Sequence, residues 1–200
     1  MKKLIQDSLI KAKSYKEYKA MILDLIKEGK STGTDQNDDL FNYTRLNEKR
    51  MLRLDKKTKL SEIAIQKAQE IEKDFTWLVL TESWCGDAAH TLPVLNKFGE
   101  ANTKIDLKVL LRDENEDLMN QFLTNGSKSI PKLIAIDKKT NKVINSWGPR
   151  SKKATNLLQV YKEKHGKIDT HIKKELQYWY HNDKGESIEN DIVEFLDLMK

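Results

Sequence analysis

The stretch Phe75-Thr76-Trp77-Leu78-Val79-Leu80-Thr81-Glu82-Ser83-Trp84-Cys85-Gly86-Asp87-Ala88 decides the fold. Its first six residues are rich in β-formers and apolar on both faces, which is typical of a central strand in a covered sheet. Residues 86–99 have a helical pattern and contain Pro93. The turn between strand and helix, Trp84–Ala88, carries Cys85. The stretch therefore predicts a strand, a turn and a helix in succession, with a thiol where the helix begins.

The sequence after this unit alternates between strand and helix patterns. Strands separated by a helix pair in parallel, whereas a tight turn joins antiparallel strands. We therefore predict an α/β fold with a central mixed β-sheet flanked by helices. Its further elements are a strand over Ile105–Leu111, a helix over Asn115–Leu123 that ends before Asn125-Gly126, a strand over Leu133–Asp137, and a turn over Lys138–Lys142 into a last strand over Val143–Trp147.

The N-terminal third of the chain has helical rather than strand patterns. Residues 4–28 favour one or two amphipathic helices, and residues 29–39 contain no apolar side chain and indicate a loop. Leu40–Asp55 hints at a further helix. Residues 61–73 form a clearer helical pattern, with Ser61 as the expected N-cap.

The C-terminal segment from Lys152 onward is also helical, with no convincing strand. Its aromatic cluster Tyr178-Trp179-Tyr180 is interpreted as packing on the domain, because helical apolar spacing usually means burial. The expected organisation is a helical N-terminal extension over 1–58, an α/β domain over 59–165, and a helical C-terminal extension over 166–200 that packs on the domain.

Composition limits the classes of function that are open to the chain. Its 200 residues suffice for one sizeable core. The net charge of +5 is spread along the sequence, which is typical of a solvated surface rather than a nucleic-acid interface. No apolar run has the length of a membrane span, so no membrane partner is expected. A single cysteine excludes an internal disulfide and favours a reducing, cytoplasmic location.

The residues around Cys85 resemble the active-site region of the thioredoxin superfamily. The start Trp84-Cys85-Gly86 matches that region, and Pro93 falls where the family's active-site helix is kinked. Ser129–Leu133 resembles the loop that holds the family's cis-proline, and Gly148 follows the last hairpin as the family would have it. The resemblance covers residues 60–165 and implies a thioredoxin-like fold with helical extensions. It is closest to uncharacterised bacterial thioredoxin-like proteins with a Trp-Cys-Gly-Asp-Ala motif.

The same resemblance implies a role for the Ile130-Pro131 bond. A cis bond there would expose the backbone of Ile130, so that an extended peptide could pair with it beside the sulfur.

Two departures from the family pattern change the expected chemistry. Ala88 stands where the family has its second, resolving cysteine, and Val79 stands where it has a buried acid. A thioredoxin releases its substrate when the second thiol attacks the mixed disulfide, so this chain needs an external thiol for that step. General dithiol disulfide reduction is therefore not expected.

The sequence places opposing influences on the pKa of the Cys85 thiol. Backbone N–H groups at the start of a helix stabilise a thiolate and lower the pKa. The nearby carboxylates of Asp87 and Glu82 raise it, and His90 can act in either direction. The sequence alone therefore does not determine whether the pKa of the Cys85 thiol is raised or lowered.

Three functions remain open. The favoured one is a monothiol thiol–disulfide oxidoreductase in cell redox homeostasis, with Cys85 catalytic and no cofactor. Its partner is then a protein or a low-molecular-weight thiol or disulfide, and the chain is a monomer or weak dimer. The residues expected to contact this partner are Trp84, Gly86, Asp87, Ile130 and Pro131.

The second function is a non-catalytic module in which the same slot binds an extended peptide. The third is a metal site formed by Cys85, Asp87 and His90, which is disfavoured because His90 points to a different face of the helix than an i+4 residue would. No Gly-rich phosphate loop or paired carboxylate occurs in the sequence, which argues against nucleotide and hydrolase chemistry.

Overall fold

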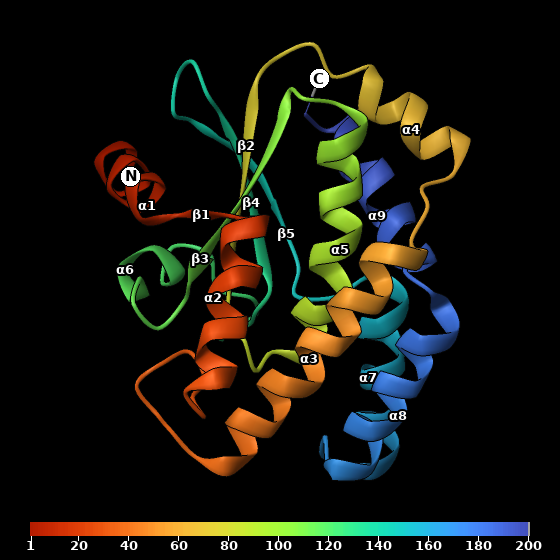
Figure 1. Ribbon diagram of the computed structural model, residues 1–200. Coiled ribbons are helices and arrows are strands. Elements are labelled where there is room, and N and C mark those ends of the chain that lie inside the picture. Colours follow the sequence, from red (N-terminus) through yellow and green to blue (C-terminus); the bar gives the residue numbers. More distant parts are fainter. Residues whose placement is uncertain (200) are drawn as a thin grey trace.

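The protein is built around a five-stranded mixed sheet, which the computed structural model describes within residues 1–199 (Figure 1). The spatial order of the strands is β1-β3-β2-β4-β5. Strands β2 and β3 are parallel, and the pairs β1–β3, β2–β4 and β4–β5 are antiparallel. The strands are β1 (Lys13–Ser14), β2 (Phe75–Thr81), β3 (Ile105–Leu111), β4 (Lys132–Asp137) and β5 (Val143–Trp147).

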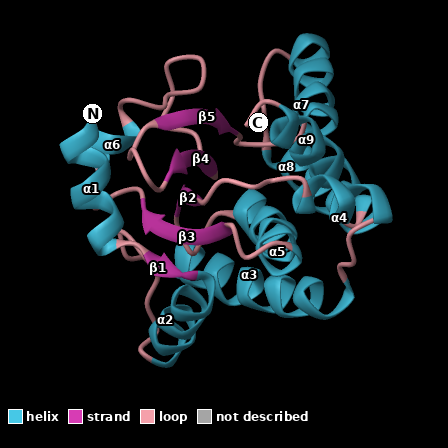
Figure 2. Ribbon diagram, turned by 90° about the horizontal axis from the view of Figure 1, so that it is seen from above, coloured by secondary structure: helices cyan, strands magenta, loops and turns pink. Residues whose placement is uncertain are grey.

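Helices cover both faces of this sheet. Figure 2 shows α1 and α6 on one side and α5, α3 and α9 on the other. The helices before β3 are α1 (Lys2–Lys11), α2 (Tyr15–Lys27), α3 (Asp38–Lys57), α4 (Glu62–Gln69) and α5 (Gly86–Ala101). Those after β3 are α6 (Glu116–Met119), α7 (Lys152–His165), α8 (Thr170–Asp183) and α9 (Glu186–Asp197).

Strand β2 lies at the centre of the core, and all seven of its residues are buried. Its Trp77 packs against Phe98 of α5, with ring centroids 6.0 Å apart, and edge-on against Phe195 of α9 at 6.1 Å. Because β2 is buried on both faces, it forms from a continuous apolar run rather than an alternating one. Its C-terminal end thereby fixes the position of the turn that carries Cys85.

The predicted α/β architecture, a central mixed β-sheet flanked by helices and extended by helices at both ends, is confirmed. The strand over Ile105–Leu111 has the predicted bounds, and the last hairpin places β5 over Val143–Trp147. Ser61 caps α4 by accepting a hydrogen bond from the backbone N–H of Ala64. These elements were predictable because each is encoded by a local pattern of apolar and capping residues.

The helix predicted over Asn115–Leu123 is shorter than expected and ends at Met119. Asn125 and Gly126 adopt left-handed conformations, with φ of 50° and 76°, and this turn joins Thr124 to Ser127 through two backbone hydrogen bonds. Between the helix and this turn, the N–H groups of Gln121 and Phe122 bond to carbonyls three residues earlier, so the chain winds more tightly than an α-helix and leaves it. Similarly, α4 ends at Gln69, four residues before the predicted end.

Both terminal extensions contribute to the domain itself. The two-residue strand β1, which is too short to leave an alternating pattern, pairs with β3 at Lys13↔Val109 and Ser14↔Lys108. At the other end, Phe195 of α9 lies in the core. Among residues 1–199, no helix combines the length and the apolar character that crossing a bilayer requires.

Candidate functional site

Cys85 lies between the end of β2 and the first turn of α5. It occupies the N-cap position of α5, and its own backbone N–H bonds to the carbonyl of Glu82. The thiol is buried, with the residue only 7% exposed, and donates a hydrogen bond to the carbonyl oxygen of Ile130 at 3.4 Å. The sulfur thus faces the start of β4, as predicted from the positions of the two motifs.

The loop before β4 contains the predicted cis bond between Ile130 and Pro131. A second cis bond, Gly148-Pro149, was not predicted. Gly148 has a φ of 111°, and a Cβ at this position would lie 2.3 Å from the carbonyl oxygen of Pro131. Only glycine can be accommodated so close to the Pro131 carbonyl. This contact joins the loop after β5 to the loop before β4.

The pKa of the Cys85 thiol is raised to about 12. Burial is the largest cause, and the negative charge of Asp87 adds to it. The backbone N–H groups of Ala88 and Asp87 and the charge of Arg150 act in the opposite direction without offsetting the burial. In this conformation, therefore, Cys85 is a protonated thiol at neutral pH.

Asp87 forms a buried ion pair that the sequence did not reveal. The guanidinium of Arg150 lies 2.7 Å from Oδ2 of Asp87, and the hydroxyl of Tyr180 donates to Oδ1 at 3.0 Å. Burial raises the pKa of the Asp87 carboxyl, and Arg150 and Tyr180 oppose that rise. Charge interactions connect this cluster to the thiol, since Asp87 and Arg150 shift its pKa in opposite directions.

Helix α8 covers the first two turns of α5. The side-chain amide of Gln177 lies over Gly86, and a Cβ on Gly86 would lie 3.0 Å from its Nε2, so a larger residue here would have to displace the Gln177 side chain. The ring of His90 stacks on Tyr180 with centroids 4.5 Å apart, and its Nε2 lies 3.2 Å from Oε1 of Gln177. Burial lowers the pKa of His90 to about 3, so its ring is neutral.

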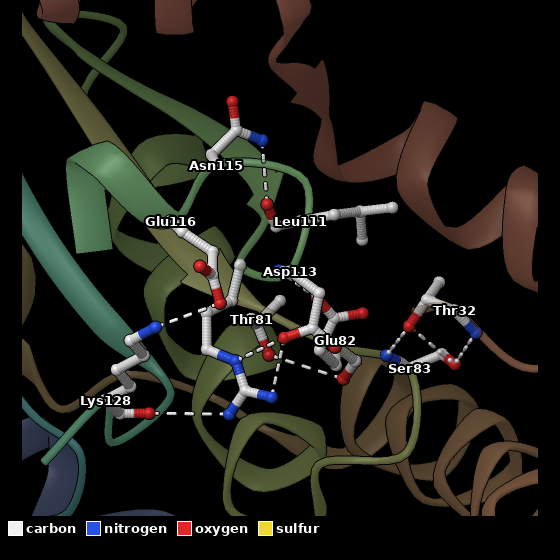
Figure 3. A network of polar contacts seen from close by, with 10 residues as sticks. Thr32, Thr81, Glu82, Ser83, Leu111, Asp113, Asn115, Glu116 and Lys128 are labelled. Carbon is white, nitrogen blue, oxygen red and sulfur yellow. Dashed lines mark hydrogen bonds and ion pairs between the residues drawn. The ribbon is translucent and has the colours of Figure 1, made fainter. Parts of the chain in front are cut away.

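The loop before α3 covers the turn from another side through Ser83. Figure 3 shows the hydrogen bonds between Thr32 and Ser83. The hydroxyl of Thr44 lies 2.8 Å from that of Ser83, and the amide of Asn47 donates to the Ser83 carbonyl. These buried contacts fix the backbone that leads into Cys85.

Two other residues of the turn contact the loop that follows β3. Trp84 is half-buried, and the guanidinium of Arg112 lies 5.1 Å from the centre of its ring. The carboxylate of Glu82 accepts a hydrogen bond from the backbone N–H of Asp113 (Figure 3). Burial raises the pKa of Glu82, and its charge is directed toward the end of β3.

A metal site at Cys85, Asp87 and His90 has no geometric support. Asp87 is engaged by Arg150 and Tyr180, and His90 by Gln177. Within the part of the chain that the structure describes, no three His, Cys, Asp or Glu side chains are grouped so that they could hold a metal ion. The other three histidines, His165, His171 and His181, are exposed.

A sequence model of the family described as thioredoxin matches residues 33–163. The chain belongs to the thioredoxin family. The match takes in Cys85, the Ile130-Pro131 bond and most of α7, and ends before α8 and α9. Of the residues that surround the thiol, Gln177 and Tyr180 thus lie outside the thioredoxin match.

Two solved structures share the thioredoxin-like fold. One is a protein of unknown function from Pseudomonas aeruginosa, with a TM-score of 0.59 and 17% identity over 94% of this chain and 99% of that one. The other is an HIV epitope scaffold, with a TM-score of 0.57 and 17% identity over 92% of this chain and 98% of that one. No curated protein matches the sequence. At this identity the two structures establish the fold alone.

Proposed function

We propose that this thioredoxin-family protein acts through a single thiol, with Cys85 exchanging with a disulfide and an external thiol completing the reaction. The observation that carries the proposal is the position of the sulfur. Cys85 caps α5, where the N–H groups of Asp87 and Ala88 favour its thiolate, and faces the Ile130 carbonyl at 3.4 Å. A thiol that lies at a helix start and beside a backbone carbonyl, and whose thiolate the N–H groups stabilise once it forms, has an arrangement that suits disulfide exchange.

The exchange proceeds in two balanced steps. The Cys85 thiolate attacks one sulfur of a disulfide R–S–S–R′, forming a mixed disulfide with R and releasing R′–S⁻. A second thiolate, R″–S⁻, then attacks the sulfur of R, which regenerates the Cys85 thiolate and releases R–S–S–R″. Ala88 supplies no internal thiol for this second step. A reducing compartment such as the cytoplasm would supply one.

The contacts around the thiol suggest how a partner would be held. The Ile130 carbonyl accepts from the Cys85 thiol and becomes free to pair with a partner backbone once the sulfur has reacted. Pro131 borders this position, and Trp84, Gly86 and Asp87 complete the turn next to the sulfur. We place the chain with bacterial proteins that carry the same Trp-Cys-Gly-Asp-Ala motif.

A direct test is to incubate the protein with a low-molecular-weight disulfide and measure its intact mass. We expect one adduct per chain that is absent from Cys85→Ser and is removed by added free thiol. Because the thiol is protonated at neutral pH, the adduct should form slowly at pH 7 and faster at pH 9. An unmodified native chain at both pH values, with a urea-unfolded chain that reacts normally, would refute the proposal.

The burial of Cys85 favours a second function, in which the fold binds a peptide without covalent chemistry. A thiol that is 7% exposed with a pKa of about 12 is poorly suited to attack. Capture of partners by wild-type protein and by Cys85→Ser, compared without reductant, separates the two. Partners that are disulfide-linked and lost in the variant support exchange, and partners that are unchanged support the binding module.

A further inference from the structure

Helix α8 contacts the start of α5 through polar side-chain groups and through the buried ring of Tyr180, which stacks on His90. The Gln177 amide lies over Gly86 and contacts His90, and the Tyr180 hydroxyl donates to Asp87. Apart from these, the helix buries one narrow stripe, formed by Ile172, Leu176 and Tyr180. Each polar contact is a single hydrogen bond, and the bond from Tyr180, whose acceptor is a carboxylate, is the stronger of the two.

Left-handed residues flank α8 at both ends. Gly166 ends α7 with a φ of 79°, and Lys184 and Gly185 separate α8 from α9 with φ of 55° and 91°. The backbone N–H groups of Gly166 and Lys184 make the last bonds of their helices, to the carbonyls of Lys162 and Tyr180, and the chain leaves the helix direction after each of them. Figure 1 shows α8 beside α7, with α9 following it.

The helix that follows α8 is held much more firmly. Helix α9 buries six residues, against three in α8, and its Phe195 packs on Trp77 in the core. The local free energy of opening of an element follows its buried contacts, so α8 should open before α9 does. The flanking joints allow this without disturbing the sheet.

We propose that α8 is a hinged cover of the Cys85 turn and that Gln177 helps to hold it closed. In the closed form α8 covers Gly86 and Asp87 and contributes to the burial of the site around Cys85. Movement of α8 uncovers the start of α5 and admits a partner. The inference rests on the proposed function, because it describes how the thiol of that reaction becomes accessible.

The test is the alkylation rate of Cys85 by iodoacetamide in the full chain at pH 8.5, with Lys174→Ala as control. Lys174 lies on the exposed face of the same helix. Gln177→Ala removes the contact over Gly86 and should speed alkylation about fivefold, the effect of one hydrogen bond. The control should react at the wild-type rate. Urea below the unfolding transition should leave the ratio of the two variants' rates unchanged, because the opening is local.

Hydrogen exchange of the unmodified protein provides a second measurement. Backbone amides of α8 should exchange faster than those of α9. Equal protection of α8 and α9 from exchange would refute the proposal that α8 is a hinged cover. Equal alkylation rates of Gln177→Ala and wild type would refute it as well. Failure of this proposal can be distinguished from failure of the proposed function. Faster alkylation with no disulfide adduct in either protein supports the cover and overturns the exchange, whereas adducts with equal alkylation do the reverse.

Discussion

Replacing Arg150 by Met should destabilise the folded chain by about 3 kcal/mol at neutral pH. The substitution leaves the Asp87 carboxylate, whose side chain is 9% exposed, with the Tyr180 hydroxyl as its hydrogen-bond donor. Breaking a buried ion pair in this way costs about 3–5 kcal/mol. We take the lower end because the Arg150 side chain is 31% exposed and partly screened by water. For a chain of this size the melting temperature should fall by about 6–12 °C.

The same substitution should make stability more dependent on pH. Burial raises the pKa of Asp87 in the folded protein, and Arg150 opposes that rise, so its removal raises the pKa further. A carboxyl whose folded pKa lies above its unfolded value stabilises the fold fully below the unfolded pKa. That contribution is lost as the pH rises through the folded pKa. The penalty of Arg150→Met should therefore be smaller at pH 5 than at pH 7.5.

Urea unfolding followed by far-UV circular dichroism at pH 5 and pH 7.5 measures both effects. The control is Lys153→Met, which changes an exposed cation three residues away. Adding Asp87→Asn to Arg150→Met should recover part of the loss, because no buried charge is then left unpaired. A loss below about 1 kcal/mol, or the same loss at both pH values, would show that the pair does not have the energetic role argued from its burial.

Three further predictions follow from the packing around the thiol. The alkylation rate of Cys85 should rise about tenfold per pH unit from pH 7 to 10, because its pKa is raised to about 12; a plateau near pH 8.5 in a kinetic series would contradict this. Gly148→Ala should cost about 3 kcal/mol or more in urea unfolding, since its Cβ would lie 2.3 Å from the Pro131 carbonyl oxygen. Ser83→Ala should cost about 2 kcal/mol by the same assay, because the buried Thr32 N–H loses its acceptor; a loss within experimental error would show that another group replaces it.

The parts of the fold that were predicted correctly are those encoded by short windows of sequence. The apolar run Phe75–Leu80 has no alternation, which indicated a strand covered on both faces, and β2 is buried along its whole length. The cysteine after it was expected at a helix start, and Cys85 caps α5. The end of a helix is encoded less clearly: the helix predicted to run to Leu123 ends at Met119, where bonds to carbonyls three residues earlier replace the α-helical ones.

The surroundings of the thiol could not be obtained in this way. Asp87 and Tyr180 are separated by 93 residues, and His90 and Gln177 by 87. Gln177 has no unusual neighbours in the sequence, and the aromatic cluster around Tyr180 was interpreted only as packing. A hydrogen bond between such distant residues depends on how the C-terminal helices dock. The pattern of residues within a short window of sequence does not reveal how those helices dock.

This difference explains why the ionisation of Cys85 was open at the level of sequence. The effects visible in the local sequence include the helix start and its N–H groups, and these lower the pKa. The largest effect is burial, which raises the pKa, and burial depends on every segment that packs around the turn. Helix α8 is one of those segments, and its contacts reach Gly86 and Asp87 on either side of the first helical peptide. A thiol at the same helix start without this cover would keep the stabilising N–H groups and lose part of the desolvation. The residues near Cys85 therefore determine where the thiol lies, and residues about 90 positions away contribute to whether it ionises.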